Sequence, residues 1–251
     1  MSDNPRTTST RSAALGSTTM GRLPREPQPV FLFHSGKGGV AKSTEALKLN
    51  YHFIKVGKTP TLIDADGTVQ DLILAHHEEQ ECHPIALSDE DGFTEIANVI
   101  AATDPASPII ASCPGGQAEI FNEYVPVILI AARNAGRKVI LVSPMDLHVN
   151  SYAHVPDVEK AMPDAEIYLL RPRWFGRPAQ FVAFNRSQLG ERYLAAERVI
   201  DVPLMPAALA RAFKDGEHSL RWVELNGSGG EKASLEAWRE KSRGAYARFL
   251  D

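Results

Sequence analysis

The stretch His34-Ser35-Gly36-Lys37-Gly38-Gly39-Val40-Ala41-Lys42-Ser43-Thr44 decides how the rest of the chain is interpreted. It follows the apolar run 30–33, typical of a buried strand, and precedes the helix-like run 45–49. A strand, a glycine-rich turn, Lys-Ser and a helix follow one another in a phosphate-binding loop. Backbone N–H groups, the positive end of the helix dipole and Lys42 would hold phosphate oxygens, and Ser43 would offer its hydroxyl to Mg²⁺. Ala41 stands where the pattern G-x-x-x-x-G-K-[ST] has its second glycine.

A second lysine, Lys37, lies inside the same stretch. Residues 37–44 read Lys-Gly-Gly-Val-x-Lys-Ser-Thr, which resembles the deviant Walker A motif of the ParA/MinD family of dimeric P-loop ATPases. The resemblance implies ATP and Mg²⁺ as cofactors, held by Gly36, Lys37, Gly38, Gly39, Val40, Ala41, Lys42, Ser43 and Thr44. It also implies a catalytic role for Lys37, which in that family reaches across a dimer interface to the partner's nucleotide. The ATP-bound form would therefore be a homodimer.

Bulk properties narrow the class of protein. The chain has 251 residues, enough for one α/β domain with a substantial core. A net charge of −4 argues against a globally basic nucleic-acid binder, although it permits a local basic patch. Cys82 and Cys113 lie far apart and predict no disulfide framework. With neither a membrane-length apolar run nor a signal-like start, the expected location is the cytoplasm.

The order of segments predicts three parts. Residues 1–27 should be a disordered basic arm, 28–225 a P-loop ATPase-like domain, and 226–251 a glycine-rich flexible joint and a C-terminal amphipathic helix. Strands are expected at 29–34, 61–63, 138–143 and 166–170, with strand-and-turn segments at 107–116 and 199–206. Helices are expected at 43–56, 93–102, 117–135 with an interruption at Pro126, 148–161 and 234–250. This alternation predicts a doubly wound, mostly parallel sheet flanked by helices in a single domain.

Two segments resemble the family's switches. Asp64-Ala65-Asp66-Gly67 ends a predicted strand, so its carboxylates should lie beside the phosphate loop. In the resembling family the second carboxylate, here Asp66, helps to position the attacking water near Mg²⁺. At the end of the segment 107–116, Ser112 stands where that family has the Walker B aspartate. A serine brings no charge, so we expect ATP binding with slow hydrolysis.

The base-side residue has two candidates. The sequence Phe-Asn-Arg at 184–186 resembles the end of a strand in that family, where an asparagine contacts the base. The corresponding residue here is Asn185. The alternation of elements instead favours a crossover helix over 180–196, which would leave Arg171 at the base side, as in some small plasmid-encoded relatives. Pro206, in a late loop that resembles the one flanking the base in the family, completes the predicted site.

Three further segments have open interpretations. Arg171, Arg173 and Arg177, with two aromatics between them, form a candidate non-specific DNA contact or a loop paired to acidic neighbours. The histidines and cysteine of the polar stretch 67–91 fit metal-ligand spacing poorly, which favours a solvated loop or helix end. The C-terminal helix either docks on its own domain or contacts a membrane as in MinD.

The leading hypothesis is thus a slow, nucleotide-switched ATPase similar to ParA-type proteins. Such proteins serve plasmid partition, stability or conjugative transfer, acting with DNA or an adaptor protein. The alternatives are a nucleotide-binding scaffold that does not hydrolyse ATP and a MinD-like membrane-positioning ATPase.

Overall fold

One parallel sheet organises the chain. The structure is a computed structural model that describes residue 1 and residues 26–67, 70–216 and 218–250. Its strands follow the order β3-β2-β4-β1-β5-β6-β7, and every pair is parallel. They are β1 (Val30–Ser35), β2 (Thr61–Asp64), β3 (Cys82–Pro84), β4 (Ile109–Gly115), β5 (Val139–Pro144), β6 (Glu166–Pro172) and β7 (Val199–Val202). The predicted doubly wound parallel sheet is confirmed, and all carboxyl ends of the strands lie at one edge.

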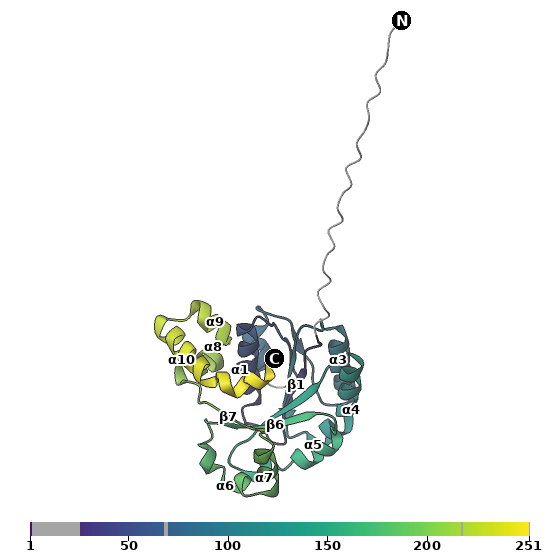
Figure 1. Ribbon diagram of the computed structural model, residues 1–251, viewed down its shortest axis with the longest axis vertical. Coiled ribbons are helices and arrows are strands. Elements are labelled where there is room, and N and C mark those ends of the chain that lie inside the picture. The colour runs from purple at the N-terminus through teal and green to yellow at the C-terminus, as the bar shows by residue number, and fades with distance from the viewer. Residues whose placement is uncertain (2–25, 68–69, 217, 251) are drawn as a thin grey trace.

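Helices cover both faces of the sheet (Figure 1). One face carries α1 (Lys42–Lys55), α2 (Asp71–His76), α8 (Ala207–Gly216), α9 (Leu220–Asn226) and α10 (Gly229–Tyr246). The other carries α3 (Glu90–Ala102), α4 (Ala118–Asn134), α5 (Val155–Ala161), α6 (Val182–Asn185) and α7 (Gln188–Ala195). Short 3₁₀ turns complete the elements at η1 (Val149–Ser151), η2 (Pro178–Gln180) and η3 (Ala247–Phe249).

The central strand β1 explains why its sequence is apolar throughout. Val30 and Leu32 point into the core beneath α3, α4 and α5, whereas Phe31 and Phe33 point into the core beneath α1 and α10. Successive side chains of a strand face opposite sides, so a strand covered on both faces has no polar side. This burial holds the loop after β1 on a rigid base.

The polar stretch 67–91 is more ordered than expected. It contains helix α2 and the edge strand β3, neither of which the sequence predicted. His76 is buried, and its Nδ1 lies 2.8 Å from the carbonyl oxygen of Leu72 in the preceding turn. No group of three His, Cys, Asp or Glu side chains in the described parts of the chain is arranged to hold a metal ion.

Three predicted helices have different limits. Helix α4 runs without a break through Pro126, which is exposed, so the carbonyl that proline leaves unpaired one turn earlier can be hydrated. The region 148–161 divides into η1 and α5, and the region 180–196 into η2, α6 and α7. The helical interpretation of 180–196 is thereby confirmed.

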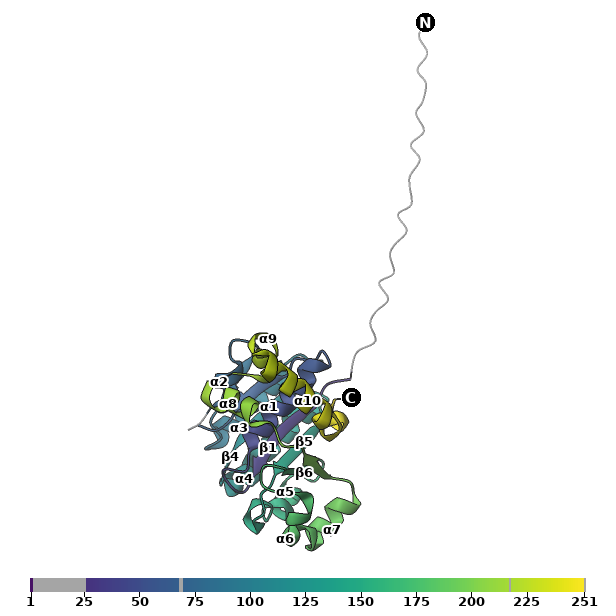
Figure 2. The same ribbon diagram turned by 90° about the vertical axis from the view of Figure 1, so that its left-hand side faces the viewer.

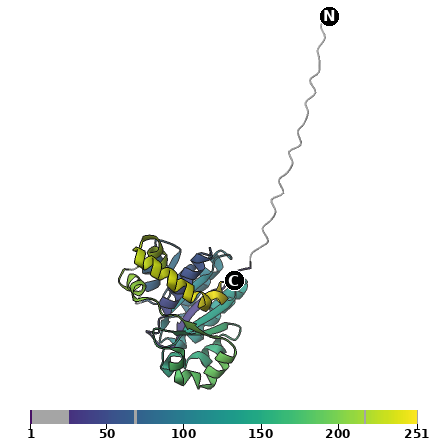
Figure 3. The same cartoon turned by 60° about the vertical axis from the view of Figure 1, so that its left-hand side comes forward.

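The C-terminal segment is part of the domain. At 226–230, where the sequence predicts a flexible joint, Ser228 and Glu231 form a capping box that starts α10 at Gly229. The apolar face of α10 packs on the sheet side that holds α1 (Figures 2 and 3). Among the described helices, none has the length and apolar character needed to cross a membrane. The predicted basic arm falls almost wholly outside the described residues.

Candidate functional site

The loop between β1 and α1 has the backbone shape of an anion-binding loop. Gly39 has φ 75° and Ala41 has φ 71°, both in the left-handed region. Left-handed residues between right-handed ones turn successive N–H groups toward one point, which makes a concave anion site. A Cβ built on Gly38 or Gly39 meets no atom within 4 Å, so there is open space beside both glycines.

Lys42 is the first residue of α1 and is 9% exposed. Burial lowers its pKa, and interactions with Cys113 and Asp66 oppose this shift. A partly desolvated ammonium at a helix start gains free energy when an anion binds beside it. Lys42 thus lies at the start of α1, next to the glycine-rich loop, and its phosphate contact stays a prediction.

Ser43 and Ser112 meet beside Lys42. Their hydroxyl oxygens lie 3.1 Å apart, which brings the Walker B position of β4 against the start of α1. The half-buried Asp66 follows β2 at the same edge. Asp64 is fully buried and accepts a hydrogen bond from the Leu72 backbone N–H at 2.9 Å, and burial raises its pKa to about 6. Hydroxyl and carboxylate oxygens are ligands that Mg²⁺ accepts, so Ser43 and Asp66 have the donor chemistry that the predicted magnesium site requires.

The last residue of β4, Gly115, lies directly against the glycine-rich loop. A Cβ added to Gly115 would sit 2.7 Å from the Gly38 Cα and 2.8 Å from its N. Only glycine permits that approach. The candidate second switch and the loop are thus in contact.

A pocket of about 410 Å³ adjoins the loop. It lies between the start of α1, the segment after β6 and the segment from β7 into α8. Its lining comprises Gly39, Ala41, Thr44, Glu45, Lys48, Arg173, Trp174, Phe175, Pro203, Leu204, Met205, Ala207, Ala210 and Arg211. Of the predicted base-side residues, Pro206 is flanked by lining residues but is not one itself.

Arg171 forms a salt bridge within its own chain. Its guanidinium bonds to both carboxylate oxygens of Asp201, at 2.7 and 2.9 Å, and to the side-chain oxygen of Asn185 at 2.8 Å. Arg171 is 6% exposed and does not line the pocket, and Asn185 serves to hold it. Within the predicted DNA patch, Arg173 and Arg177 are exposed.

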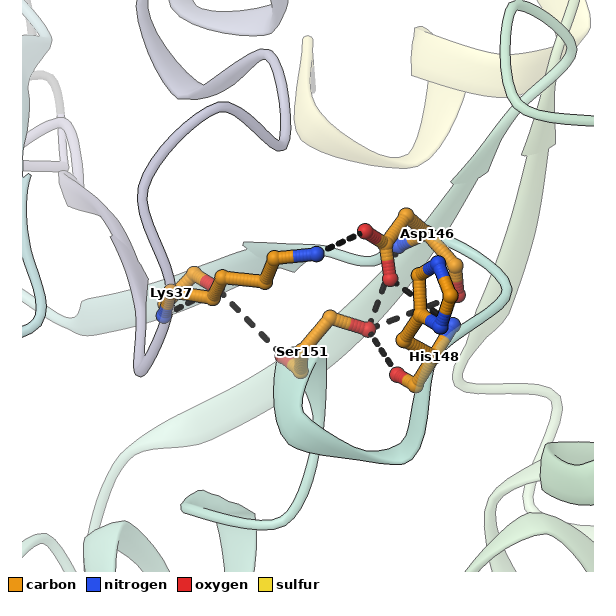
Figure 4. Close-up of polar contacts among 5 residues, drawn as sticks. Lys37, Asp146, His148 and Ser151 are labelled. Carbon is orange, nitrogen blue, oxygen red and sulfur yellow. Dashed lines mark hydrogen bonds and ion pairs between the residues drawn. The ribbon is translucent and has the colours of Figure 1, made fainter.

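Lys37 is held by its own chain (Figure 4). Its Nζ lies 2.6 Å from an oxygen of Asp146, which follows β5 at the same edge of the sheet. The His148 backbone N–H donates to the other carboxylate oxygen at 2.8 Å. Burial favours a higher pKa for Asp146, but the bonds from Lys37 and His148 outweigh it and lower the pKa. Lys37 therefore has an intramolecular partner.

Asp146 was not among the predicted site residues. It stands two positions beyond the end of β5, where the rule for the carboxyl edge of parallel strands would have found it. Glu45 and Lys48 were also missed, because an acidic and a basic residue three positions apart on a helix usually form an exposed pair.

Comparison with known proteins identifies the fold. Protein MobD of Acidithiobacillus ferrooxidans is 22% identical to this chain over 217 residues, which are 85% of this chain and 94% of that protein. The MinC:MinD cell division protein complex of Aquifex aeolicus superposes with a TM-score of 0.52 at 16% identity, covering 85% of this chain and 95% of the matched one. The chain has the fold of MinD.

A nucleotide-binding protein of Archaeoglobus fulgidus, solved in complex with ADP, shares this MinD fold. It superposes with a TM-score of 0.50 at 16% identity over 75% of this chain and 86% of its own. No protein-family model matches the sequence. At these identities the comparisons establish the fold, and the chemistry depends on the residues described above.

Proposed function

We propose that this protein is a nucleotide-switched ATPase of the ParA/MinD type, which binds ATP with Mg²⁺ and hydrolyses it slowly. The observation that supports this most is the junction of an anion-binding loop, with Lys42 at its end, and an apolar pocket of about 410 Å³. The loop suits a polyphosphate and the pocket suits a nucleoside. Binding of ADP by the A. fulgidus protein of the same fold is consistent with such a ligand.

The residues at the loop divide the chemistry between them. Lys42 would neutralise the β- and γ-phosphates, and Ser43 would coordinate Mg²⁺, with Asp66 orienting the attacking water. When bound, Mg²⁺ would neutralise the phosphate charge. Ser112 offers a hydroxyl in place of a Walker B carboxylate, so the site would supply one charged group fewer beside a bound Mg²⁺. Slow turnover follows from that loss.

The Lys37–Asp146 ion pair suggests how nucleotide and dimerisation are coupled. To reach a partner's nucleotide, Lys37 must leave a carboxylate at 2.6 Å. The ion pair would therefore favour the monomer until a bound triphosphate offers Lys37 more negative charge than Asp146 does. The ATP-bound homodimer would be the active state.

Exposed arginines suggest which partner the ATP-bound dimer would bind. Arg173 and Arg177 are exposed, and they could contact a DNA backbone, whereas Arg171 is committed to Asp201. Plasmid partition, stability or conjugative transfer, with an adaptor protein, is the setting that the sequence resemblance implies. The docked apolar face of α10 makes membrane positioning a weaker candidate.

Titration of the purified protein with ATP in the presence of Mg²⁺ tests the proposal. We expect binding that Lys42→Ala weakens at least a hundredfold, and ATP-dependent dimers in sedimentation experiments that Lys37→Ala abolishes. Equal ATP affinity of wild type and Lys42→Ala would refute the proposed site.

A non-hydrolysing scaffold is a second candidate, favoured by the contact of Ser112 with Ser43 where a carboxylate would be expected. Single-turnover measurements separate the two. Hydrolysis by the wild type that Asp66→Asn removes supports the ATPase. ATP binding without any hydrolysis, together with hydrolysis gained in Ser112→Asp, supports the scaffold.

A further inference from the structure

The floor of the pocket contains a buried ion pair. Thr44 and Lys48 lie four residues apart on α1, so they share the helix face that borders the pocket, and Glu45 lies beside them. The Lys48 side chain is 6% exposed and that of Glu45 is fully buried. Burying two charges is unfavourable unless each finds partners of good geometry.

The pair is held by a residue from the far end of the chain. Lys48 Nζ donates to one oxygen of Glu45 at 2.6 Å, and the Tyr246 hydroxyl donates to the other at 2.8 Å across a separation of 201 residues. Burial, and then the Glu45 carboxylate, raise the pKa of Tyr246 well above its usual value, so the hydroxyl stays a donor. Helix α10 thereby fixes the orientation of Glu45, and Glu45 fixes that of Lys48.

Lys48 has donor capacity left over. An ammonium carries three N–H groups. Within the described residues, Glu45 is the acceptor recorded for Lys48, which leaves N–H groups beside the pocket. Much of the remaining lining is apolar, including Pro203, Leu204 and Met205. In a largely apolar pocket, the few polar groups determine which ligand fits and how it is oriented.

We propose that Lys48 is a specificity-determining residue that donates a hydrogen bond to an acceptor atom in the nucleoside part of the bound nucleotide, with Tyr246 as a positioning residue. The inference rests on the proposed nucleotide-binding function and deepens it. Lys48 is separated along α1 from the phosphate-binding residues Lys42 and Ser43, so its contribution should be limited to the nucleoside.

The test compares two ligands that differ by the nucleoside: ATP and tripolyphosphate, each titrated calorimetrically with Mg²⁺. The double variant Glu45→Gln/Lys48→Met removes both charges together, which avoids leaving one of them buried alone. We expect its ATP affinity to fall about tenfold, the value of one hydrogen bond from a charged donor. Its tripolyphosphate affinity should stay within about twofold of wild type.

A matched pair of variants tests the role of α10. Tyr246→Phe removes only the hydroxyl on Glu45 and should weaken ATP binding several-fold without affecting tripolyphosphate. Ser242→Ala removes the neighbouring polar contact between α10 and α1, to His52 at 2.9 Å, and should change neither affinity. If Ser242→Ala weakens ATP binding as much as Tyr246→Phe, the effect comes from general docking of α10 and the positioning role is overturned.

The remaining outcomes are decisive. Equal losses for ATP and tripolyphosphate in the double variant, or no loss for either, overturn the specificity role of Lys48 while the proposed function stands. If the wild-type protein binds neither ATP nor tripolyphosphate, the proposed function itself is overturned. With wild type, 2′,3′-dideoxy-ATP identifies the acceptor: a tenfold weaker affinity than ATP assigns it to a ribose hydroxyl, and an equal affinity assigns it to the base.

Discussion

Replacing Ala41 by glycine should stabilise the ligand-free protein, because this alanine has a backbone conformation that side chains disfavour. Ala41 has φ 71° and ψ 29° immediately before α1. The left-handed region costs a residue with a Cβ roughly 1–2 kcal/mol, which glycine avoids. Glycine also gives the unfolded chain more freedom, and that offsets roughly 0.4–1 kcal/mol. The difference between the middles of these two ranges gives an expected net gain of about 0.8 kcal/mol in the free energy of unfolding.

Equilibrium unfolding in urea measures this gain. Trp238 is 2% exposed in the folded protein, so its fluorescence should report the loss of the core. The midpoint should rise without a change in slope, since the buried area is unchanged. In thermal unfolding, a domain of this size should gain roughly 1–4 °C.

Glu197 provides a matched control. It is the other non-glycine residue with positive φ in the described chain, at 54°, and it lies between α7 and β7. Glu197→Gly should give a similar gain at a position remote from the phosphate loop. If Ala41→Gly is no more stable than wild type while Glu197→Gly is, the backbone argument for the loop is refuted and the Ala41 methyl must make compensating contacts.

Three further changes follow from the site and the core. Gly115→Ala should weaken ATP binding at least tenfold with an unchanged circular dichroism spectrum, because its Cβ would lie 2.7 Å from the Gly38 Cα; unchanged affinity contradicts the contact. Asp146→Asn should release Lys37 and give ATP-dependent dimers at several-fold lower protein concentration in ultracentrifugation; a weaker dimer contradicts the proposed role of the ion pair. Stability should fall between pH 7 and 5, because burial is the main cause that lowers the pKa of three histidines from 6.5 to about 4: His52, His76 and His154. The contribution of each histidine to the free energy of unfolding is fully present above pH 6.5 and falls by roughly 2 kcal/mol by pH 5. Asp64, with its pKa raised to about 6, opposes this fall, because its contribution rises by roughly 1 kcal/mol over the same range. A urea midpoint that does not fall at pH 5 would show that these histidines are not neutral in the fold.

The architecture was predictable because its signals are local. Apolar strands buried on both faces and the loop at 34–44 appear in the sequence without reference to the rest of the chain. The edge strand β3 was missed because Cys82-His83-Pro84 has no strand pattern, and it pairs only because β2 offers a free edge. Pro126 was read as an interruption, since the sequence does not reveal that it faces water on an otherwise continuous helix.

The sequence predicted which site residues follow the carboxyl end of a strand, but it did not predict which residues their side chains contact. The rule for parallel sheets placed Asp66 and Ser112 at the same end of the sheet as Ser43, and the 3.1 Å contact of Ser112 with Ser43 agrees with it. The rule does not supply the register between strands. Arg171 lies opposite Asp201 in the pairing of β6 with β7, and that partner turns its side chain from the ligand pocket to a salt bridge.

The Lys48–Glu45 pair is the case that local patterns cannot resolve. Three positions apart on a helix, these residues have the pattern of an exposed ion pair worth a few tenths of a kcal/mol. The folded structure places Tyr246, 201 residues later in the chain, against Glu45. Glu45 is fully buried there, and one of its carboxylate oxygens accepts a hydrogen bond from the Tyr246 hydroxyl. Bulk water competes less for a charged group that is buried beside a pocket. A ligand can therefore form stronger hydrogen bonds with the N–H groups that this charge has left unused. The packing of α10 therefore determines that Lys48 can act as a recognition group. The sequence near the phosphate loop does not reveal this packing.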